Sequence, residues 1–411
     1  MTASGLGNDR LDRLSDYPFT RLASLLADQP VRINRPTLML SLGEPQHPPP
    51  PLIDEALRAN AHLWGKYPPV GGTAEFRAAV AGWLSRRYRL AEGLLDPEVS
   101  VLPVAGTREA LFLAALLAVP EQKAGRRPAV LMPNPFYAVY EGAAALAGGE
   151  PVFLSASPET GFLPDLDALT PELLERTALF YLCSPGNPQG AAADAAYFTR
   201  AIGLARHYGF VLAVDECYSE IYTTVPPIGA LEVAAGLAGG AGVAWGESSP
   251  WSNLLVFHSL SKRSSAAGLR SGFVAGDPAL LGRFSRLRSY ANAGSPLPVL
   301  AAATALWRDE AHVENNRARY RAKFDAAAAE LDGRFGFYRP AGGFFLWLNV
   351  GCGESACRRL WTEAGVRVLP GAYLSRTDDN GHNPGAAYIR VALVHEADLI
   401  AEACARMARV L

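Results

Sequence analysis

The feature of this 411-residue chain that most restricts its fold is a series of solidly apolar runs that alternate with helical patterns. The runs cover residues 99–104, 129–132, 151–156, 178–183 and 210–216. A strand that is apolar on both faces needs cover on both faces, which is typical of parallel sheets with crossover helices. The series therefore predicts an α/β fold in which a mostly parallel sheet is sandwiched by helices.

One strand of this sheet is expected to run against the others. An apolar strand at 254–257 is followed by another at 271–276, and a short polar loop without a helical pattern lies between them. A parallel return needs a crossover of about a dozen residues or more, usually a helix. We therefore expect the strand at 271–276 to be antiparallel to its predecessor.

The order of elements changes after Gly333. Strands are expected at 342–350, 366–371 and 387–394, helices at 354–364 and 396–410, and one long Ala- and Arg-rich helix at 298–331 before them. This order predicts a smaller α+β unit that packs with the N-terminal segment. The expected division is an N-terminal arm and part of the small domain at 1–47, a large ligand-binding domain at 48–295, and a small C-terminal domain at 296–411.

Composition and charge exclude several classes of function. The formal net charge is −2, so the chain has no overall basic field that would attract nucleic acid. It has no run of about 18 or more apolar residues that would span a membrane, and MTASGLGNDRLDRL at its start lacks the apolar core of a signal peptide. Five cysteines without paired motif spacing indicate reduced thiols. We therefore expect a cytoplasmic protein with no nucleic-acid or membrane partner.

The loop that leaves the strand at 254–257 concentrates groups that bind anions. It carries Ser259, Ser261 and Lys262, and Arg270 follows the lysine by eight residues. Hydroxyls and a guanidinium suit a phosphate. A partly desolvated lysine beside cations would have a lowered pKa and could attack an aldehyde. The loop predicts either a Schiff-base lysine beside a phosphate cup or an ordinary basic loop.

Two more candidates follow strands of the parallel series, where ligands bind in open α/β sheets. Gly106, Thr107 and Arg108 open a helix, and backbone N–H groups there either favour an anion or form a plain helix cap. Asn187 lies in a Pro- and Gly-rich loop, where its amide would donate to a phenolate oxygen or serve a turn.

Two charged residues are attached to apolar strands. Asp215 follows five apolar residues, so its carboxylate needs an N–H or cationic partner, such as a protonated pyridine nitrogen, unless it caps a helix. Tyr218 offers a hydroxyl three residues later. Arg390 lies inside an apolar strand and needs an anion, either a substrate carboxylate or an internal acid beside an edge strand.

Other motifs carry less weight. GCGESA at 351–356 matches the dinucleotide pattern G-x-G-x-x-A, but it lies outside the long series of strands and helices. The chain has no G-x-x-x-x-G-K-[ST], no HExxH and no paired CxxC, and its histidines lack metal-ligand spacing. We expect no metal site.

Taken in order, these residues resemble the class I and II aminotransferases of pyridoxal-phosphate fold type I, from LSLGEP at 40–45 to IRVAL at 389–393. The resemblance implies that fold, pyridoxal 5′-phosphate as cofactor, and amino-group transfer between an amino acid and a 2-oxo acid. It implies that Lys262 holds the cofactor as a Schiff base and acts as the general base, and that Asp215 pairs with the pyridine nitrogen.

The same resemblance assigns the other site residues. It implies a phosphate cup made of Ser259, Ser261, Arg270 and the backbone at Gly106, Thr107 and Arg108. It implies that Tyr137 stacks on the cofactor ring, that Asn187 and Tyr218 bind its 3′ oxygen, and that Gly43, Asn187 and Arg390 hold the substrate carboxylate. Tyr67 resembles the tyrosine that reaches the phosphate of the neighbouring subunit, which implies a homodimer.

A narrower resemblance concerns the substrate. GTREALF, SPGNPQG, DECYSEIY and HSLSKRSSAAGLRSGF are similar to bacterial succinyldiaminopimelate aminotransferases of lysine and cell-wall biosynthesis. This implies N-succinyl-LL-diaminopimelate as donor and 2-oxoglutarate as acceptor. The chain departs from that group in Ser-Ser-Ala-Ala after Lys262-Arg263, where Asn and Pro are more common, and in Tyr290-Ala291-Asn292 in place of a Tyr-His-type pair.

Three alternatives to this substrate or activity stay open. They are another amino donor such as aspartate or alanine, a C–S lyase on the same fold, and a non-catalytic cofactor-binding regulator. Such regulators usually append a DNA-binding helix-turn-helix, for which the first 40 residues are too short and not basic enough.

Overall fold

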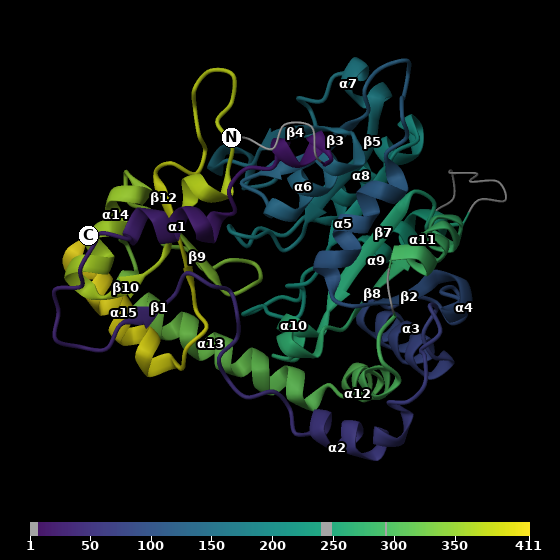
Figure 1. Cartoon of the computed structure of the whole chain (residues 1–411), viewed down its shortest axis with the longest axis horizontal. Helices are drawn as coiled ribbons and strands as arrows, with labels where there is room; N and C mark the ends of the chain where they lie inside the picture. The colour runs from purple at the N-terminus through teal and green to yellow at the C-terminus, as the bar shows by residue number, and fades with distance from the viewer. Residues whose placement is uncertain (1–6, 240–248, 292–293) are drawn as a thin grey trace.

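A computed structural model of the chain describes residues 7–239, 249–291 and 294–411. Within these ranges, the central sheet has seven strands in the order β2-β8-β7-β6-β5-β3-β4, with helices packed around it (Figure 1). The strands are Val101–Val104 (β2), Ala129–Asn134 (β3), Glu150–Ser155 (β4), Thr177–Cys183 (β5), Val211–Asp215 (β6), Leu254–Ser259 (β7) and Gly272–Gly276 (β8). The predicted α/β sandwich is therefore confirmed.

Strand β8 is the antiparallel member of this sheet. It runs against β7 on one side and against β2 on the other, whereas the remaining neighbours are parallel. The connection from β7 contains two short helical turns, Leu260–Arg263 (α10) and Ala267–Leu269 (η4), where no helix was expected. These turns are too short to cross the sheet, so the expected antiparallel return is confirmed.

Both faces of the sheet are buried, as the apolar runs require. In β7, Leu254 and Val256 belong to one hydrophobic core, whereas Leu255 and Phe257 belong to the other. Successive side chains of a strand point to opposite faces, which explains this division. The helices around the sheet are Leu52–Ala59 (α2), Ala74–Tyr88 (α3), Pro97–Ser100 (α4), Thr107–Ala118 (α5), Ala138–Ala147 (α6), Pro171–Arg176 (α7), Ala195–Tyr208 (α8), Ala230–Gly239 (α9), Pro278–Ala291 (α11) and Leu297–Arg308 (α12).

The long helix expected at 298–331 is two helices, α12 and Ala311–Leu331 (α13), so that prediction is wrong. The interruption falls at Asp309 and Glu310. The Asp309 carboxylate accepts a hydrogen bond from the backbone N–H of His312 at 3.0 Å. A side chain that satisfies this N–H competes with continuous helix and favours a new start.

The C-terminal part forms a second, smaller layer with the N-terminal segment. Its sheet has the order β11-β12-β9, from Phe345–Asn349 (β9), Leu369–Pro370 (β11) and Tyr388–Ala392 (β12). Leu38–Met39 (β1) pairs in parallel with Val366–Arg367 (β10), which joins the N-terminal segment to the C-terminal unit. The helices are Pro18–Leu26 (α1), Gly353–Arg359 (α14), continued by a π-turn at Leu360–Ala364 (η5), and Ala397–Val410 (α15).

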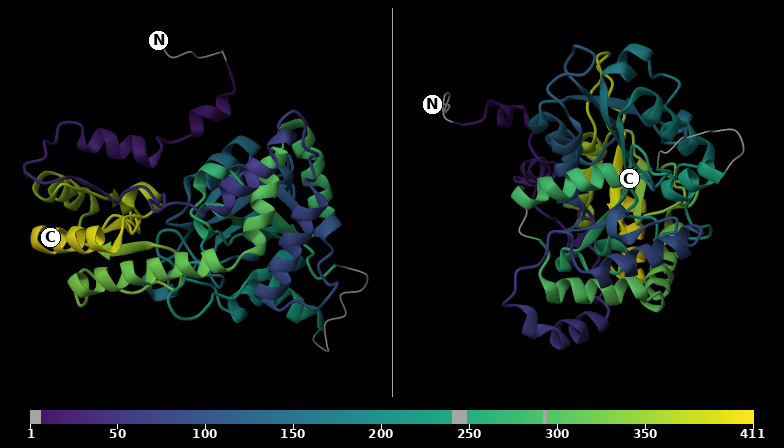
Figure 2. Two further views of the ribbon diagram at one scale, coloured as in Figure 1. Left: turned by 90° about the horizontal axis from the view of Figure 1, so that it is seen from below. Right: turned by 90° about the vertical axis from the view of Figure 1, so that its right-hand side faces the viewer.

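The segment from α1 to β1 thus lies beside the C-terminal elements, as the left view of Figure 2 shows for α1. The α+β unit and its association with the N-terminal segment are as expected, while the division at residues 47 and 295 stays a prediction. Every described helix is too short or too polar to span a bilayer.

Candidate active site

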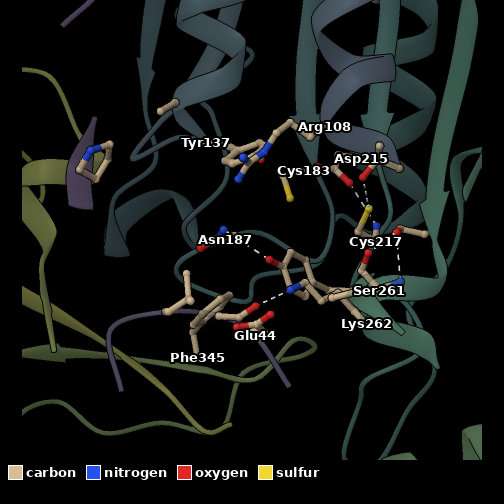
Figure 3. Close-up of a pocket in the computed structure, with 18 of the residues that line it drawn as sticks. Glu44, Arg108, Tyr137, Cys183, Asn187, Asp215, Cys217, Ser261, Lys262 and Phe345 are labelled. Carbon is tan, nitrogen blue, oxygen red and sulfur yellow. Dashed lines mark hydrogen bonds between the residues drawn. The ribbon is translucent and has the colours of Figure 1, made fainter. Parts of the chain in front are cut away.

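A cavity of about 680 Å³ opens where β5, β6 and β7 end, between the central sheet and the C-terminal unit (Figure 3). Most of the residues singled out from the sequence line it: Gly43, Thr107, Arg108, Tyr137, Asn187, Asp215, Tyr218, Ser259, Ser261, Lys262, Arg270 and Arg390. Gly106 directly precedes Thr107, the first residue of α5. The cavity therefore gathers segments that lie far apart in the sequence.

Lys262 extends from α10 into this cavity. Ser259 caps the helix, since its Oγ accepts a hydrogen bond from the Ser261 backbone N–H at 3.1 Å. The Lys262 Nζ donates to the carbonyl oxygen of Gly43. Burial lowers the pKa of Lys262 to about 8, and Arg390 and Arg270 contribute to the decrease. A substantial fraction of this amine is therefore neutral near pH 8.

The Gly43 carbonyl can approach Lys262 because residue 43 has no side chain. A Cβ atom at this position would lie 2.6 Å from the Cζ atom of Phe345. The ring of Phe345 in turn lies 4.4 Å from the guanidinium carbon of Arg390. Glycine is therefore required where the N-terminal segment crosses β9.

The Gly106 turn and Arg270 form a compact set of donors. Gly106 has a φ of +86°, and a Cβ there would lie 2.3 Å from Nη2 of Arg270. The first N–H groups of α5, at Thr107 and Arg108, have no partner within the helix. The Ser259 and Ser261 hydroxyls lie 2.9 Å apart on the adjoining loop. Helix N–H groups, hydroxyls and a guanidinium together suit a phosphate.

Asp215 is buried at the end of β6, with 5% of its surface exposed. Its Oδ2 accepts from the Tyr140 hydroxyl at 2.9 Å and its Oδ1 from the Cys217 backbone N–H at 3.2 Å. Burial raises the pKa of this carboxyl group. The following residues form turns rather than a helix, so it is not a helix cap. A cationic ligand atom would stabilise its ionised form.

Arg390 is also buried, with 5% of its surface exposed. Its Nη1 donates to Asn187 Oδ1 at 3.1 Å and its Nη2 to the Ser41 carbonyl at 2.7 Å. Among the described residues no acid forms an ion pair with it, and its Nε has no partner. Burial lowers the pKa of Arg390 to about 10. Because β12 is the central strand of its sheet, the edge-strand interpretation is wrong.

The remaining polar side chains of the cavity form pairs. Asn187 Nδ2 lies 3.4 Å from the Tyr218 hydroxyl. Tyr137 precedes α6, and its hydroxyl accepts from Arg108 Nε at 2.7 Å. Burial raises the pKa of Tyr137 to about 12, so this hydroxyl is protonated at neutral pH.

Sequence reasoning missed several residues of this site. Tyr140 lies one helical turn after Tyr137, a spacing that could have revealed it. Glu44, Tyr17 and Phe345 also line the cavity, but they enter through packing of the N-terminal segment and β9, for which no local pattern exists.

Two further positions lie apart from the cavity or beyond the described chain. The side chain of Tyr67 is 99% exposed and does not line the cavity. Its expected contact with a neighbouring subunit stays a prediction. Asn292 lies outside the described residues.

Comparisons with known proteins give the family. The model of the family "Aminotransferase class I and II" matches residues 35–407. The 4-dedimethylamino-4-oxo-anhydrotetracycline transaminase OxyQ of Streptomyces rimosus is 33% identical over 370 residues, 90% of this chain and 92% of OxyQ. The LL-diaminopimelate aminotransferase of Syntrophobacter fumaroxidans is 31% identical over 408 residues, 97% of each chain. A solved aminotransferase of Neisseria meningitidis has a TM-score of 0.91 and 39% identity, covering 98% of this chain and 99% of that one. The chain therefore belongs to the class I and II aminotransferases, enzymes that depend on pyridoxal phosphate.

Proposed function

We propose that Lys262, Asp215 and Arg390 form the catalytic centre of this aminotransferase, with N-succinyl-LL-diaminopimelate as amino donor and 2-oxoglutarate as acceptor. The observation that carries the proposal is their placement around one cavity. An amine with a pKa of about 8 faces it, together with a buried carboxylate without an ion pair among the described residues and a buried guanidinium.

These residues fit the cofactor of the family. The donors around Gly106 and Arg270 suit its phosphate, Asp215 suits a protonated ring nitrogen, and Asn187 with Tyr218 suits its phenolic oxygen. Pyridoxal phosphate, when bound, supplies an aldehyde for amines and a ring that accepts electrons from the substrate α-carbon.

The side chains of this chain then have separate tasks. Arg390 binds the substrate α-carboxylate through its Nη atoms, and Asn187 keeps that guanidinium in place. Lys262 Nζ takes the proton from the substrate α-carbon as general base, which its lowered pKa favours. Asp215 would pair with the ring nitrogen as a carboxylate, because the Tyr140 hydroxyl and the Cys217 N–H stabilise its ionised form.

Two exposed residues at the rim of the cavity bear on the donor. Arg108 is a cation that would pair with the carboxylate of a succinyl group. Glu44 is an acid that would pair with the free distal ammonium of unmodified LL-diaminopimelate. The name of the Syntrophobacter relative makes LL-diaminopimelate the second candidate donor. The motif resemblance favours the succinylated donor.

The first experiment tests the lysine. The purified protein reconstituted with pyridoxal phosphate should absorb in the visible, and borohydride should link the cofactor covalently. Lys262→Ala should abolish the link. Lys123→Met is the matched control, since burial also lowers the pKa of Lys123 but this residue lies outside the cavity. A borohydride-stable adduct in Lys262→Ala, or none in the wild type, would refute the assignment.

The second experiment tests the donor. The holoenzyme is mixed with single amino acids while absorbance reports conversion of the cofactor to its aminated form. N-succinyl-LL-diaminopimelate should react at least about tenfold faster than aspartate or alanine, because they lack the distal group. Arg108→Met should slow the succinylated donor selectively, and Glu44→Gln should slow LL-diaminopimelate. Faster conversion by aspartate or alanine would reject the proposed donor, and release of a thiol from cysteine substrates would indicate a C–S lyase.

We also propose a cytoplasmic homodimer in which Tyr67 contacts the phosphate of the neighbouring subunit. The exposure of Tyr67 outside its own cavity supports this role. Tyr67→Phe should weaken cofactor binding roughly tenfold or more, since a charge-assisted hydrogen bond is worth about 1.5–3 kcal/mol. A monomer in sedimentation experiments, or unchanged affinity, would argue against the shared site.

A further inference from the structure

A buried polar network holds the loop of Lys262 from outside the cavity. Asn316, on α13, is 6% exposed. Its Nδ2 donates to the carbonyl oxygens of Lys262 and Arg263, both at 3.0 Å. These residues end α10, and the last carbonyls of a helix have no partner within it. One amide therefore satisfies both carbonyls at the point where the Lys262 side chain begins.

The other side of Asn316 meets the N-terminal segment and the residues after α10. Its Oδ1 lies 2.5 Å from Nε2 of His47 and 3.1 Å from Oγ of Ser265. Ser265 has a φ of +50°, a left-handed conformation that is uncommon for serine. It belongs to the Ser-Ser-Ala-Ala stretch by which this chain departs from the succinyldiaminopimelate aminotransferases.

The hydrogen bonds define the tautomer of His47. The amide oxygen of Asn316 can only accept, so its contact with His47 assigns the ring proton to Nε2, which also lies 2.5 Å from Oγ of Ser265. The Nδ1 of His47 is then an acceptor, and Nζ of Lys323 lies 3.3 Å from it. Lys323 also donates to the carbonyl of Val394 at 3.3 Å, in the segment that follows β12. The network thus joins the Lys262 loop to the strand of Arg390.

The pKa shifts of His47 and Lys323 favour a neutral His47 ring that accepts at Nδ1. Burial lowers the pKa of His47, and the charges of Lys323 and Arg319 lower it further, whereas the hydrogen bond to Asn316 and the charge of Glu396 raise it. Burial also lowers the pKa of Lys323 to about 8. The charge of Arg319 lowers it further, whereas the charge of Glu396 raises it. The lowered pKa of His47 favours the neutral ring, which an acceptor at Nδ1 requires.

We propose that Asn316 is a positioning residue for Lys262. With His47 and Ser265 behind it, its amide holds the end of α10 and thereby sets the point from which the Lys262 amine enters the cavity. The proposal rests on the role assigned to Lys262 above. A displacement of about 1 Å in a reacting group can slow a reaction by about a hundredfold, so a loosened α10 should show in the reactivity of the amine.

The test uses the full chain freed of cofactor and shown to be folded at the assay temperature by circular dichroism. Pyridoxal phosphate is added, and visible absorbance follows Schiff-base formation by Lys262. Binding of 4′-deoxypyridoxine 5′-phosphate, which lacks the aldehyde, is measured in parallel. In Asn316→Ala the Schiff base should form at least about tenfold more slowly, with the affinity for the analogue within about threefold of wild type.

Tyr320→Phe is the matched control on the same helix. Tyr320 is buried beside His47, and its hydroxyl has no hydrogen-bond partner in the described chain. This variant should react within about twofold of the wild type, since no bond to α10 is lost. Ser265→Ala, which removes the hydroxyl contacts to Asn316 and His47 but leaves both bonds from Asn316 to α10, should slow Schiff-base formation by a smaller factor than Asn316→Ala.

Three outcomes would overturn the proposal. They are a rate within about twofold of wild type in folded Asn316→Ala, a parallel loss of rate and analogue affinity that indicates a general collapse, and an equal slowing in Tyr320→Phe. If Asn316→Ala does not fold, Asn316→Asp is judged by the same criteria. Lys262→Ala distinguishes failure of the Lys262 assignment from failure of the Asn316 proposal. A Schiff base in Lys262→Ala would refute the lysine assignment. If Lys262→Ala forms none and Asn316→Ala reacts at the wild-type rate, only the positioning role of Asn316 is rejected.

Discussion

At the scale of single residues, burial controls the ionisation of the groups on which the proposed reaction depends. It lowers the pKa of Lys262 to about 8 and that of Arg390 to about 10, and it raises the pKa of Asp215. Each pKa shift disfavours the ionised form of its group, and a partner of opposite charge would stabilise that form. In the proposed function, a protonated ring nitrogen would be the partner of Asp215 and a substrate carboxylate that of Arg390.

Gly106 provides a test at this scale. Gly106→Ala would place a Cβ against the Arg270 guanidinium in a conformation that costs alanine about 1 kcal/mol or more. Loss of one charge-assisted hydrogen bond, about 1.5–3 kcal/mol, should raise the dissociation constant for pyridoxal phosphate roughly tenfold or more. Equilibrium titration of the cofactor measures this change.

Gly148→Ala is the control for backbone strain. Gly148 also has a positive φ, of +90°, but it ends α6 away from the cavity. This variant should lose stability without losing affinity for the cofactor. Equal loss of affinity in the two variants would mean that Gly106 acts through stability alone.

At the scale of elements, short connections between strands or helices position key residues of the candidate site. The return from β7 to β8 is built from two short turns, and it holds Lys262 and Arg270 at one edge of the sheet. The break between α12 and α13 lets the first helix pack Trp307 on the large core while the second continues to the C-terminal unit, where Leu331 is buried. The break between α12 and α13 involves the side chain of Asp309.

The Asp309 side chain tests this dependence. Asp309→Ala removes the acceptor for the His312 backbone N–H and the partner of its ring Nδ1, which should lower the free energy of unfolding by about 1 kcal/mol or more. Asp309→Asn keeps an acceptor and should lose less. Urea unfolding of the variants gives the comparison, and equal stability of Asp309→Ala and wild type would contradict the cap.

At the scale of the whole molecule, the cavity exists because two parts of the chain close over the end of the sheet. The large sheet contributes Asp215 and Lys262, whereas the C-terminal unit contributes Arg390 and the N-terminal segment contributes Gly43. Assembly of the fold therefore buries an amine that water would otherwise stabilise in its charged form.

This burial makes the stability of the cofactor-free protein depend on pH. The unfolded chain keeps Lys262 protonated up to its ordinary pKa of 10.5, whereas the folded chain releases the proton near 8. Between these values the unfolded state binds more protons, so the contribution of Lys262 to stability rises with pH. Lys262→Met should exceed the wild type in stability at pH 7, and this advantage should shrink between about pH 8 and 10.5.

Urea unfolding at several pH values measures the difference between the two proteins. Lys66→Met, at an exposed lysine, is the matched control. A difference between Lys262→Met and wild type that stays constant over this range would show that the Lys262 amine is not desolvated by folding.

The sequence by itself determined the class of fold and much of the site. Apolar runs and their alternation with helices are local signals, so they predicted the parallel sheet, the antiparallel β8 and the small C-terminal unit. Strand ends marked by Asp215, Asn187 and the Lys262 loop predicted where a ligand would bind, because the carboxyl ends of parallel strands meet at one edge.

Only the tertiary structure decided which distant segments meet these strand ends. Gly43 reaches Lys262 across 219 positions of sequence, and Asn316 holds the end of α10 from a helix that was expected to continue unbroken. No local pattern encodes such contacts, since they depend on how the N-terminal segment, α13 and β12 pack against the sheet. The same packing withdraws the Lys262 amine from water, and that desolvation, rather than the motif alone, lowers its pKa to about 8.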